Sequence, residues 1–145
     1  MRTEAHPGPD RGARFLPQPR MGSFISRQSE SEDKMHHIKG DLQHEGKPVV
    51  VDITYCRNCD GGDQEKRTAI AAVEEALPGC SLNVTRLDSY PVQVTVSTKS
   101  FGGHKVIWSG AQRNLFSKYP QLRSKAMAEI VETTRSIAKQ GGLVL

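Results

Sequence analysis

The sequence predicts an α/β domain in which two main helices cover a four-stranded mixed sheet, in the order β-α-β-β-β-α. Three observations predict this class. After residue 47, apolar residues recur with a period of two in four short segments, as in strands. Segments 63–77 and 120–140 instead carry apolar residues at helical spacing. The first helix lies between two strands, which favours parallel pairing through a right-handed crossover.

Composition divides the chain into three parts. Residues 1–47 mix Pro, Gly, Ser, Arg and acidic residues without apolar periodicity, so they are expected to form a disordered N-terminal extension. The folded domain is expected from 48 to 140, and residues 141–145 are expected to be a C-terminal tail. Within the extension, Met21 and Gly22 match the start of an N-myristoylation signal, which would act only if translation began at Met21.

The first strand and first helix come directly after the extension. The strand shows alternating apolar residues from Val49 to Tyr55, and Pro78 and Gly79 end the helix that follows. The apolar face of this helix is expected to consist of Ala69, Ile70, Val73, Ala76 and Leu77.

Three more strands and a second helix complete the predicted domain. Leu82 and Val84 indicate a short strand, and alternating valines from Val92 to Val96 indicate a longer one. Val106 and Trp108 are expected to alternate in a fourth strand, joined to the third by a hairpin. The last helix is expected to begin at Pro120 and to bury one stripe formed by Leu122, Ala126, Ile130, Thr134 and Ile137.

Charge and hydropathy exclude several classes of function. Twenty Lys and Arg against sixteen Asp and Glu give a net charge of +4 that is spread along the chain, so no nucleic-acid partner is expected. No transmembrane segment is expected, because no apolar stretch is long enough. A cytoplasmic location is the default. Organelle import is the alternative, because the arginines of the extension are typical of transit peptides, although Glu4 and Asp10 are not.

The three cysteines carry the most specific chemical signal. An odd number, with Cys56 and Cys59 two residues apart, indicates redox or metal chemistry rather than a stapled secreted domain. Placed where a strand gives way to a helix, the pair can close a disulfide while the first sulfur stays exposed. The positive end of the helix dipole would favour a thiolate on Cys56. Cys56 is therefore the candidate nucleophile and Cys59 the candidate resolving residue.

Two alternatives to redox catalysis remain open at this point. A Cys pair is also half of a zinc site, which Cys80 with His104 or His44 could complete. Against this, Cys80 is expected at the opposite end of the β-α-β unit from the pair, as a buried small apolar residue. We therefore expect no metal and no cofactor. The other alternative is a redox-regulated binding module, in which the pair senses oxidation without turnover.

Five segments together resemble the selenoprotein W, T and H group of thioredoxin-like proteins, also called the Rdx family. The resemblance covers residues 49 to about 139 and rests on Tyr55-Cys56-Arg57-Asn58-Cys59, Leu77-Pro78-Gly79-Cys80, Val92-Gln93-Val94-Thr95-Val96, Val106-Ile107-Trp108-Ser109-Gly110 and Asn114-Leu115-Phe116-Ser117-Lys118-Tyr119-Pro120. The last segment is most like the selenoprotein H branch. Many members of the group carry selenocysteine at the second motif position, so Cys59 resembles the sulfur version.

The resemblance implies a thioredoxin-like fold and a thiol-disulfide oxidoreductase in cellular redox homeostasis. Its partners would be protein or small-molecule thiols and disulfides, among them glutathione and thioredoxin-like proteins. Thioredoxin-like proteins carry a cis-proline before a core strand, and Pro91 stands at that position. Pro91 and Tyr90 are therefore candidate substrate-binding residues, although a proline is also tolerated at the start of any strand.

Overall fold

The computed structural model describes residues 35–56, 63–87 and 92–145, and everything below refers to them. In chain order, the elements are β1 (Met35–Ile38), β2 (Gln43–His44), β3 (Lys47–Pro48), β4 (Val50–Tyr55), α2 (Gln64–Ala76), β5 (Ser81–Arg86), β6 (Gln93–Thr98), β7 (Lys105–Ala111), the 3₁₀ helix η1 (Gln112–Leu115) and α3 (Pro120–Gln140). A mixed α/β fold with two main helices is thus confirmed.

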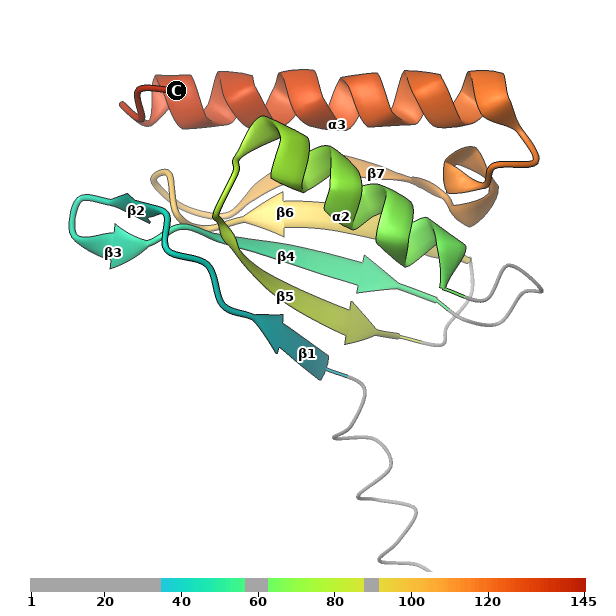
Figure 1. The fold of residues 1–145 in the computed structure, drawn as a ribbon, viewed down its shortest axis with the longest axis horizontal. Helices are drawn as coiled ribbons and strands as arrows, with labels where there is room; N and C mark the ends of the chain where they lie inside the picture. The colour runs from blue at the N-terminus through green and yellow to red at the C-terminus, as the bar shows by residue number, and fades with distance from the viewer. Residues whose placement is uncertain (1–34, 57–62, 88–91) are drawn as a thin grey trace, which may run out of the picture.

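The main sheet has five strands in the order β1-β5-β4-β6-β7 (Figure 1). β4 and β5 are parallel and are joined through α2, as expected for a β-α-β crossover. β6 pairs antiparallel with β4, and β7 pairs antiparallel with β6. The carboxyl end of β4, the start of β6 and the end of β7 therefore meet at one end of the sheet, which we call the Cys56 end.

The predicted disordered extension, residues 1–47, is too long, because residues from Met35 onward form strands of the fold. β1 pairs antiparallel with β5 and adds a fifth strand to the expected four. All four of its side chains are exposed, so this strand has no apolar alternation that could reveal it in the sequence. β2 and β3 then form a short separate hairpin before β4. Residues 35–47, which the prediction assigned to the extension, are therefore part of the described fold.

The helices and the sheet bury one continuous core. In β4, Val51, Ile53 and Tyr55 are buried, while the residues between them are partly exposed, as the period of two predicts. α2 and α3 pack against each other and against the same face of the sheet (Figure 1). The other face is polar and is covered by no described helix, and it carries a chain of hydrogen bonds from His37 through Asn83 to Asp52.

The fourth predicted strand differs from expectation in its pairing. Val106 and Trp108 were expected to alternate on one face, but a β-bulge between Val96 and Ser97 shifts the register of β7. Val106 pairs with Ser97 and is 53% exposed, whereas Trp108 is buried. The indole nitrogen of Trp108 donates a hydrogen bond to Glu129 of α3, at 3.0 Å.

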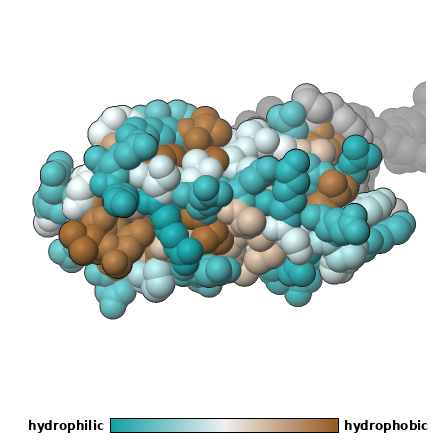
Figure 2. Space-filling model, turned by 90° about the horizontal axis from the view of Figure 1, so that it is seen from above, coloured by the Kyte–Doolittle hydropathy of each residue, from teal (hydrophilic) through white to brown (hydrophobic). Residues whose placement is uncertain are grey.

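The last helix is amphipathic, as its spacing predicts. Its buried residues include Ala126, Ile130 and Thr134, but Leu122 is 41% exposed and does not belong to the buried stripe. The view from above shows a mostly hydrophilic or neutral surface with small separate hydrophobic patches (Figure 2). Beyond the helix, Leu143 turns back and packs against the core, so the predicted tail is partly folded onto the domain.

The segment after β1 is expected to tolerate no side chain at Gly40. A Cβ atom there would lie 2.0 Å from the Gly79 carbonyl oxygen, and the Gly40 amide donates to the Ser81 hydroxyl at 3.0 Å. We predict that Gly40→Ala lowers the free energy of unfolding by about 1–3 kcal/mol, as overpacking does. Urea denaturation measures this. Gly102→Asn is the control, since that site is open and its positive φ suits Asn. Equal stability of Gly40→Ala and wild type would contradict the packing of this segment.

Candidate functional site

Cys56 lies immediately after β4, at the Cys56 end of the sheet. Only a short stretch of chain separates this position from α2, which begins at Gln64 after its N-cap residue Asp63. Tyr55 is the last residue of the strand, and its carbonyl accepts a hydrogen bond from the amide of Leu87, at 2.7 Å. The predicted resolving residue, Cys59, lies outside the described residues.

The environment of Cys56 corrects one expectation. The first sulfur of the pair was expected to be exposed, but the residue is buried, with 0% of its surface accessible. One physical reason lies in η1, which follows β7 and returns to the end of β4. There the side-chain amide of Gln112 donates a hydrogen bond to the Cys56 carbonyl oxygen, at 3.0 Å. A thiol in this position reacts only after the surrounding residues separate.

A buried polar cluster adjoins Cys56. Glu65, in the first turn of α2, is 0% exposed, and Gln112 is 3% exposed. Neither carboxylate oxygen of Glu65 has a hydrogen-bond partner in the described part of the chain, nor does the amide oxygen of Gln112. Buried polar atoms without partners are rare in folded proteins and concentrate at functional sites. We call Cys56, Glu65 and Gln112 the buried polar cluster.

Burial raises the pKa of the Glu65 carboxyl above its ordinary value, because the charged form loses its hydration. Its own backbone amide and the Gln112 side chain lie near the carboxyl group, although not at hydrogen-bonding geometry, and lower the pKa by smaller amounts. Asp63 raises it further and Lys66 lowers it, but these two side chains also pair with each other at 3.5 Å. The carboxyl group of Glu65 is therefore biased toward its neutral form.

The two predicted substrate-binding residues, Tyr90 and Pro91, lie outside the described residues. The described residues nearest to them on either side are Leu87 and Val92. The hydrogen bond from Leu87 to Tyr55 and the start of β6 at Gln93 place both flanks at the Cys56 end.

Cys80 lies at the opposite end of the sheet, as expected. In the parallel pair, Val50 is level with Ser81 and Tyr55 with Arg86. Five residues of strand span about 17 Å, so Cys56 and Cys80 are too far apart to share a ligand or a disulfide. His44 contacts Phe101, in the turn that also carries His104, and this turn too lies at the Cys80 end. The zinc site that would combine Cys56 with these residues is therefore wrong, and no metal-binding group of three occurs among the described residues.

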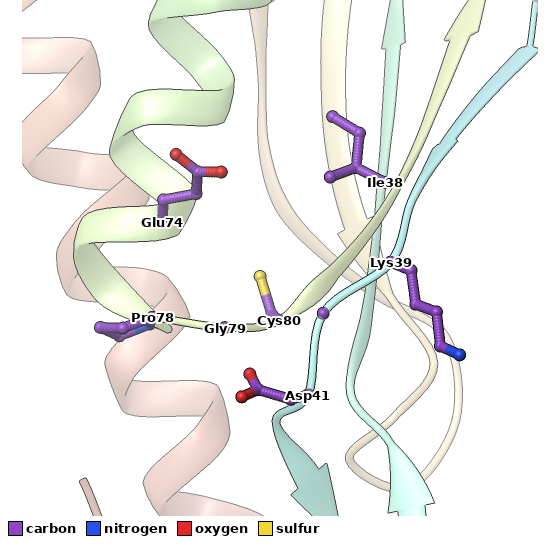
Figure 3. A pocket seen from close by; sticks show the side chains of 8 residues that line it. Ile38, Lys39, Asp41, Glu74, Pro78, Gly79 and Cys80 are labelled. Carbon is purple, nitrogen blue, oxygen red and sulfur yellow. The ribbon is translucent and has the colours of Figure 1, made fainter.

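A pocket of about 620 Å³ lies beside Cys80, between the end of α2 and the segment after β1. In Figure 3 the sulfur points into the space between Glu74 and Ile38. Cys80 itself is only 5% exposed. Burial, aided by the charge of Glu74, raises the pKa of its thiol to about 11. This thiol is therefore protonated and unreactive near neutral pH.

Sequence reasoning missed Glu65 and Gln112. A signal for Glu65 exists, since it stands four residues before Ala69 on the buried stripe of α2, where a charged residue is unexpected. Gln112 gave no signal, because its position depends on how η1 turns back after β7.

Comparisons with protein-family models, with curated proteins and with solved structures found no match. Among the described residues, neither helix combines the length and the apolar composition of a membrane span. The following interpretation of function therefore depends on the geometry of the site and on the motifs of the sequence.

Cys80 is predicted to resist alkylation in the native protein. With a pKa of about 11, the thiol is ionised in about one molecule in ten thousand at pH 7, compared with a few per cent for an ordinary cysteine. Iodoacetamide followed by peptide mass spectrometry should find Cys80 unmodified until the protein is unfolded in urea. Rapid labelling in the native state would contradict both its burial and its raised pKa.

Proposed function

We propose that this protein is a thiol-disulfide oxidoreductase that uses Cys56 as the nucleophile and Cys59 as the resolving thiol. The observation that carries the proposal is the position of Cys56, directly after a central parallel strand and before the helix of a β-α-β unit. That position keeps the Cys-x-x-Cys motif at a strand-to-helix junction, where its two thiols are within one turn of each other in the chain.

The proposed reaction needs only the two thiols. The Cys56 thiolate attacks one sulfur of a substrate disulfide, which forms a mixed disulfide and releases one substrate thiol after protonation. The Cys59 thiolate then attacks the Cys56 sulfur and releases the second substrate thiol. The substrate is reduced, and the protein is left with a Cys56–Cys59 disulfide. Two glutathione thiols, or one dithiol protein of thioredoxin-like chemistry, would reduce it for the next cycle.

The fold and the motifs support the same proposal. The order of β5, β4, β6 and β7, with helices on one face, agrees with the thioredoxin-like arrangement implied by the resemblance to the selenoprotein W, T and H group. In that arrangement, Tyr90 and Pro91 would line the substrate groove beside Cys56, and the described residues that flank them lie at the correct end of the sheet. A reducing compartment such as the cytoplasm would keep the dithiol ready to act.

A second candidate function is favoured by the complete burial of Cys56. A covered thiol suits a redox-regulated binding module, in which oxidation changes the surface at the Cys56 end and thereby the affinity for a partner. The two functions differ in rate. An oxidoreductase turns over many disulfides, whereas a module changes its binding once for each oxidation.

Replacing Cys56 tests the proposed reaction. Purified protein is expected to reduce hydroxyethyl disulfide in the presence of glutathione, and Cys56→Ser should reduce the rate to the uncatalysed background, because the proposed exchange starts at the Cys56 thiol. Cys80→Ser is the matched control and should keep full activity, since Cys80 lies at the other end of the sheet. A wild-type rate equal to background would leave the binding module as the better interpretation.

Replacing Cys59 tests the order of the two thiols. Cys59→Ser blocks resolution, so a substrate disulfide should remain attached to Cys56 as a stable adduct. Non-reducing mass spectrometry is expected to find this adduct at Cys56 and to show its release by dithiothreitol. Adducts found at Cys80 instead would contradict the assignment.

A further inference from the structure

The buried polar cluster lacks one hydrogen-bond donor. Gln112 uses its amide nitrogen to hold the Cys56 carbonyl, and the amide oxygen of Gln112 and both oxygens of Glu65 have no partner at hydrogen-bonding geometry among the described residues. A carboxylate can only accept hydrogen bonds, but a protonated carboxyl group can also donate one. One proton on Glu65 would therefore supply the missing donor and remove an uncompensated buried charge.

The surroundings of Glu65 keep this proton in place. Few charged groups near it could stabilise the ionised carboxylate. On α2, Lys66 pairs with Asp63, and the Arg123 side chain of α3 donates instead to Thr68, at 3.4 Å. In the described part of the chain, the other neighbouring elements bring no buried cation to Glu65: η1 has the exposed Arg113, β6 has no titratable residue, and the end of β4 has Tyr55 and Cys56.

We propose that Glu65 and Gln112 form a proton-dependent latch on the nucleophile: neutral Glu65 donates to the Gln112 amide oxygen and keeps Cys56 covered, and ionised Glu65 releases it. The inference rests on the proposed function, which gives the release of Cys56 its purpose. Glu65 acts through Gln112 and is therefore a positioning residue. The proton that leaves Glu65 goes to solvent or to the leaving thiolate of the exchange.

The sign of the pH dependence follows from the raised pKa of Glu65. A carboxyl group with a raised pKa in the folded state stabilises the closed cluster below that pKa, and this contribution is lost as pH rises through it. The latch is therefore closed at low pH and opens as pH increases. Glu65→Gln replaces the neutral acid by a neutral amide donor, so this variant should stay closed at every pH.

The decisive experiment compares alkylation of Cys56 in the reduced full-length wild type and in Glu65→Gln, by peptide mass spectrometry from pH 5 to pH 9. Dividing the wild-type rate by the variant rate removes every pH effect that the two proteins share. The ratio of the wild-type rate to the Glu65→Gln rate should be near one at low pH and should rise to about tenfold as pH increases. Tenfold is the factor expected from losing one buried hydrogen bond. Glu75→Gln, at an exposed position of the same helix, is the matched control and should behave like wild type. A ratio that stays at one throughout would overturn the proposal.

Two further measurements test the two partners of the latch. Infrared spectroscopy should show the carbonyl stretch of a buried protonated carboxyl group in the wild type at the low end of this pH range, and Glu65→Gln should remove it. Its absence from the wild type would overturn the neutral state of Glu65. Gln112→Met keeps the length of the side chain but removes its amide, so in this background the alkylation ratio should no longer depend on pH. A ratio that still rose would overturn the role of Gln112.

The outcomes separate the latch from the function on which it rests. A wild-type protein that exchanges no disulfides would contradict the proposed oxidoreductase. The infrared band and the alkylation ratio would still test the latch in that case. A flat ratio in a protein that does exchange disulfides would overturn the latch alone.

Discussion

The parallel pairing of β4 with β5 is the constraint on which the arrangement of the site depends. Parallel neighbours need a crossover, and here α2 supplies it, so the residues before α2 and those after it lie at opposite ends of the sheet. Cys56 and Cys80 are separated for this reason, although only 23 residues divide them in the sequence. The pairing keeps the candidate redox pair away from the third thiol, and it brings the first turn of α2 to the end of β4.

Burial then gives the two thiols different chemistry. Cys80 is covered by the segment after β1 and lies near Glu74, so its pKa is raised and the thiol is inert. Cys56 is buried too, but its carbonyl accepts a hydrogen bond from the Gln112 amide of η1, and Glu65 lies in the same cluster. In the proposed latch, the contact between Glu65 and Gln112 separates when one proton leaves, so Cys56 can be released without unfolding of the domain.

The sequence predicted the elements whose burial follows a period and failed where pairing or tertiary contacts decide. The alternation in β4 and the apolar stripe of α2 identified both elements nearly to the residue. β1 escaped prediction because its side chains are exposed and its stability comes from backbone pairing with β5. Val106 was expected to alternate with Trp108 but is exposed, because a bulge is not visible in one strand alone. The position of Cys56 was predictable, but its burial depends on η1, which is distant in sequence.

The antiparallel pairing of β1 has a practical consequence for handling the protein. Met35 is level with Thr85, near the Cys56 end, whereas α3 ends at Gln140, after which Gly142 lies beside His44 at the Cys80 end. A fusion partner or affinity tag attached after Leu145 would therefore lie at the opposite end of the sheet from Cys56, and a surface that holds the protein by this tag would leave the Cys56 end accessible to a partner.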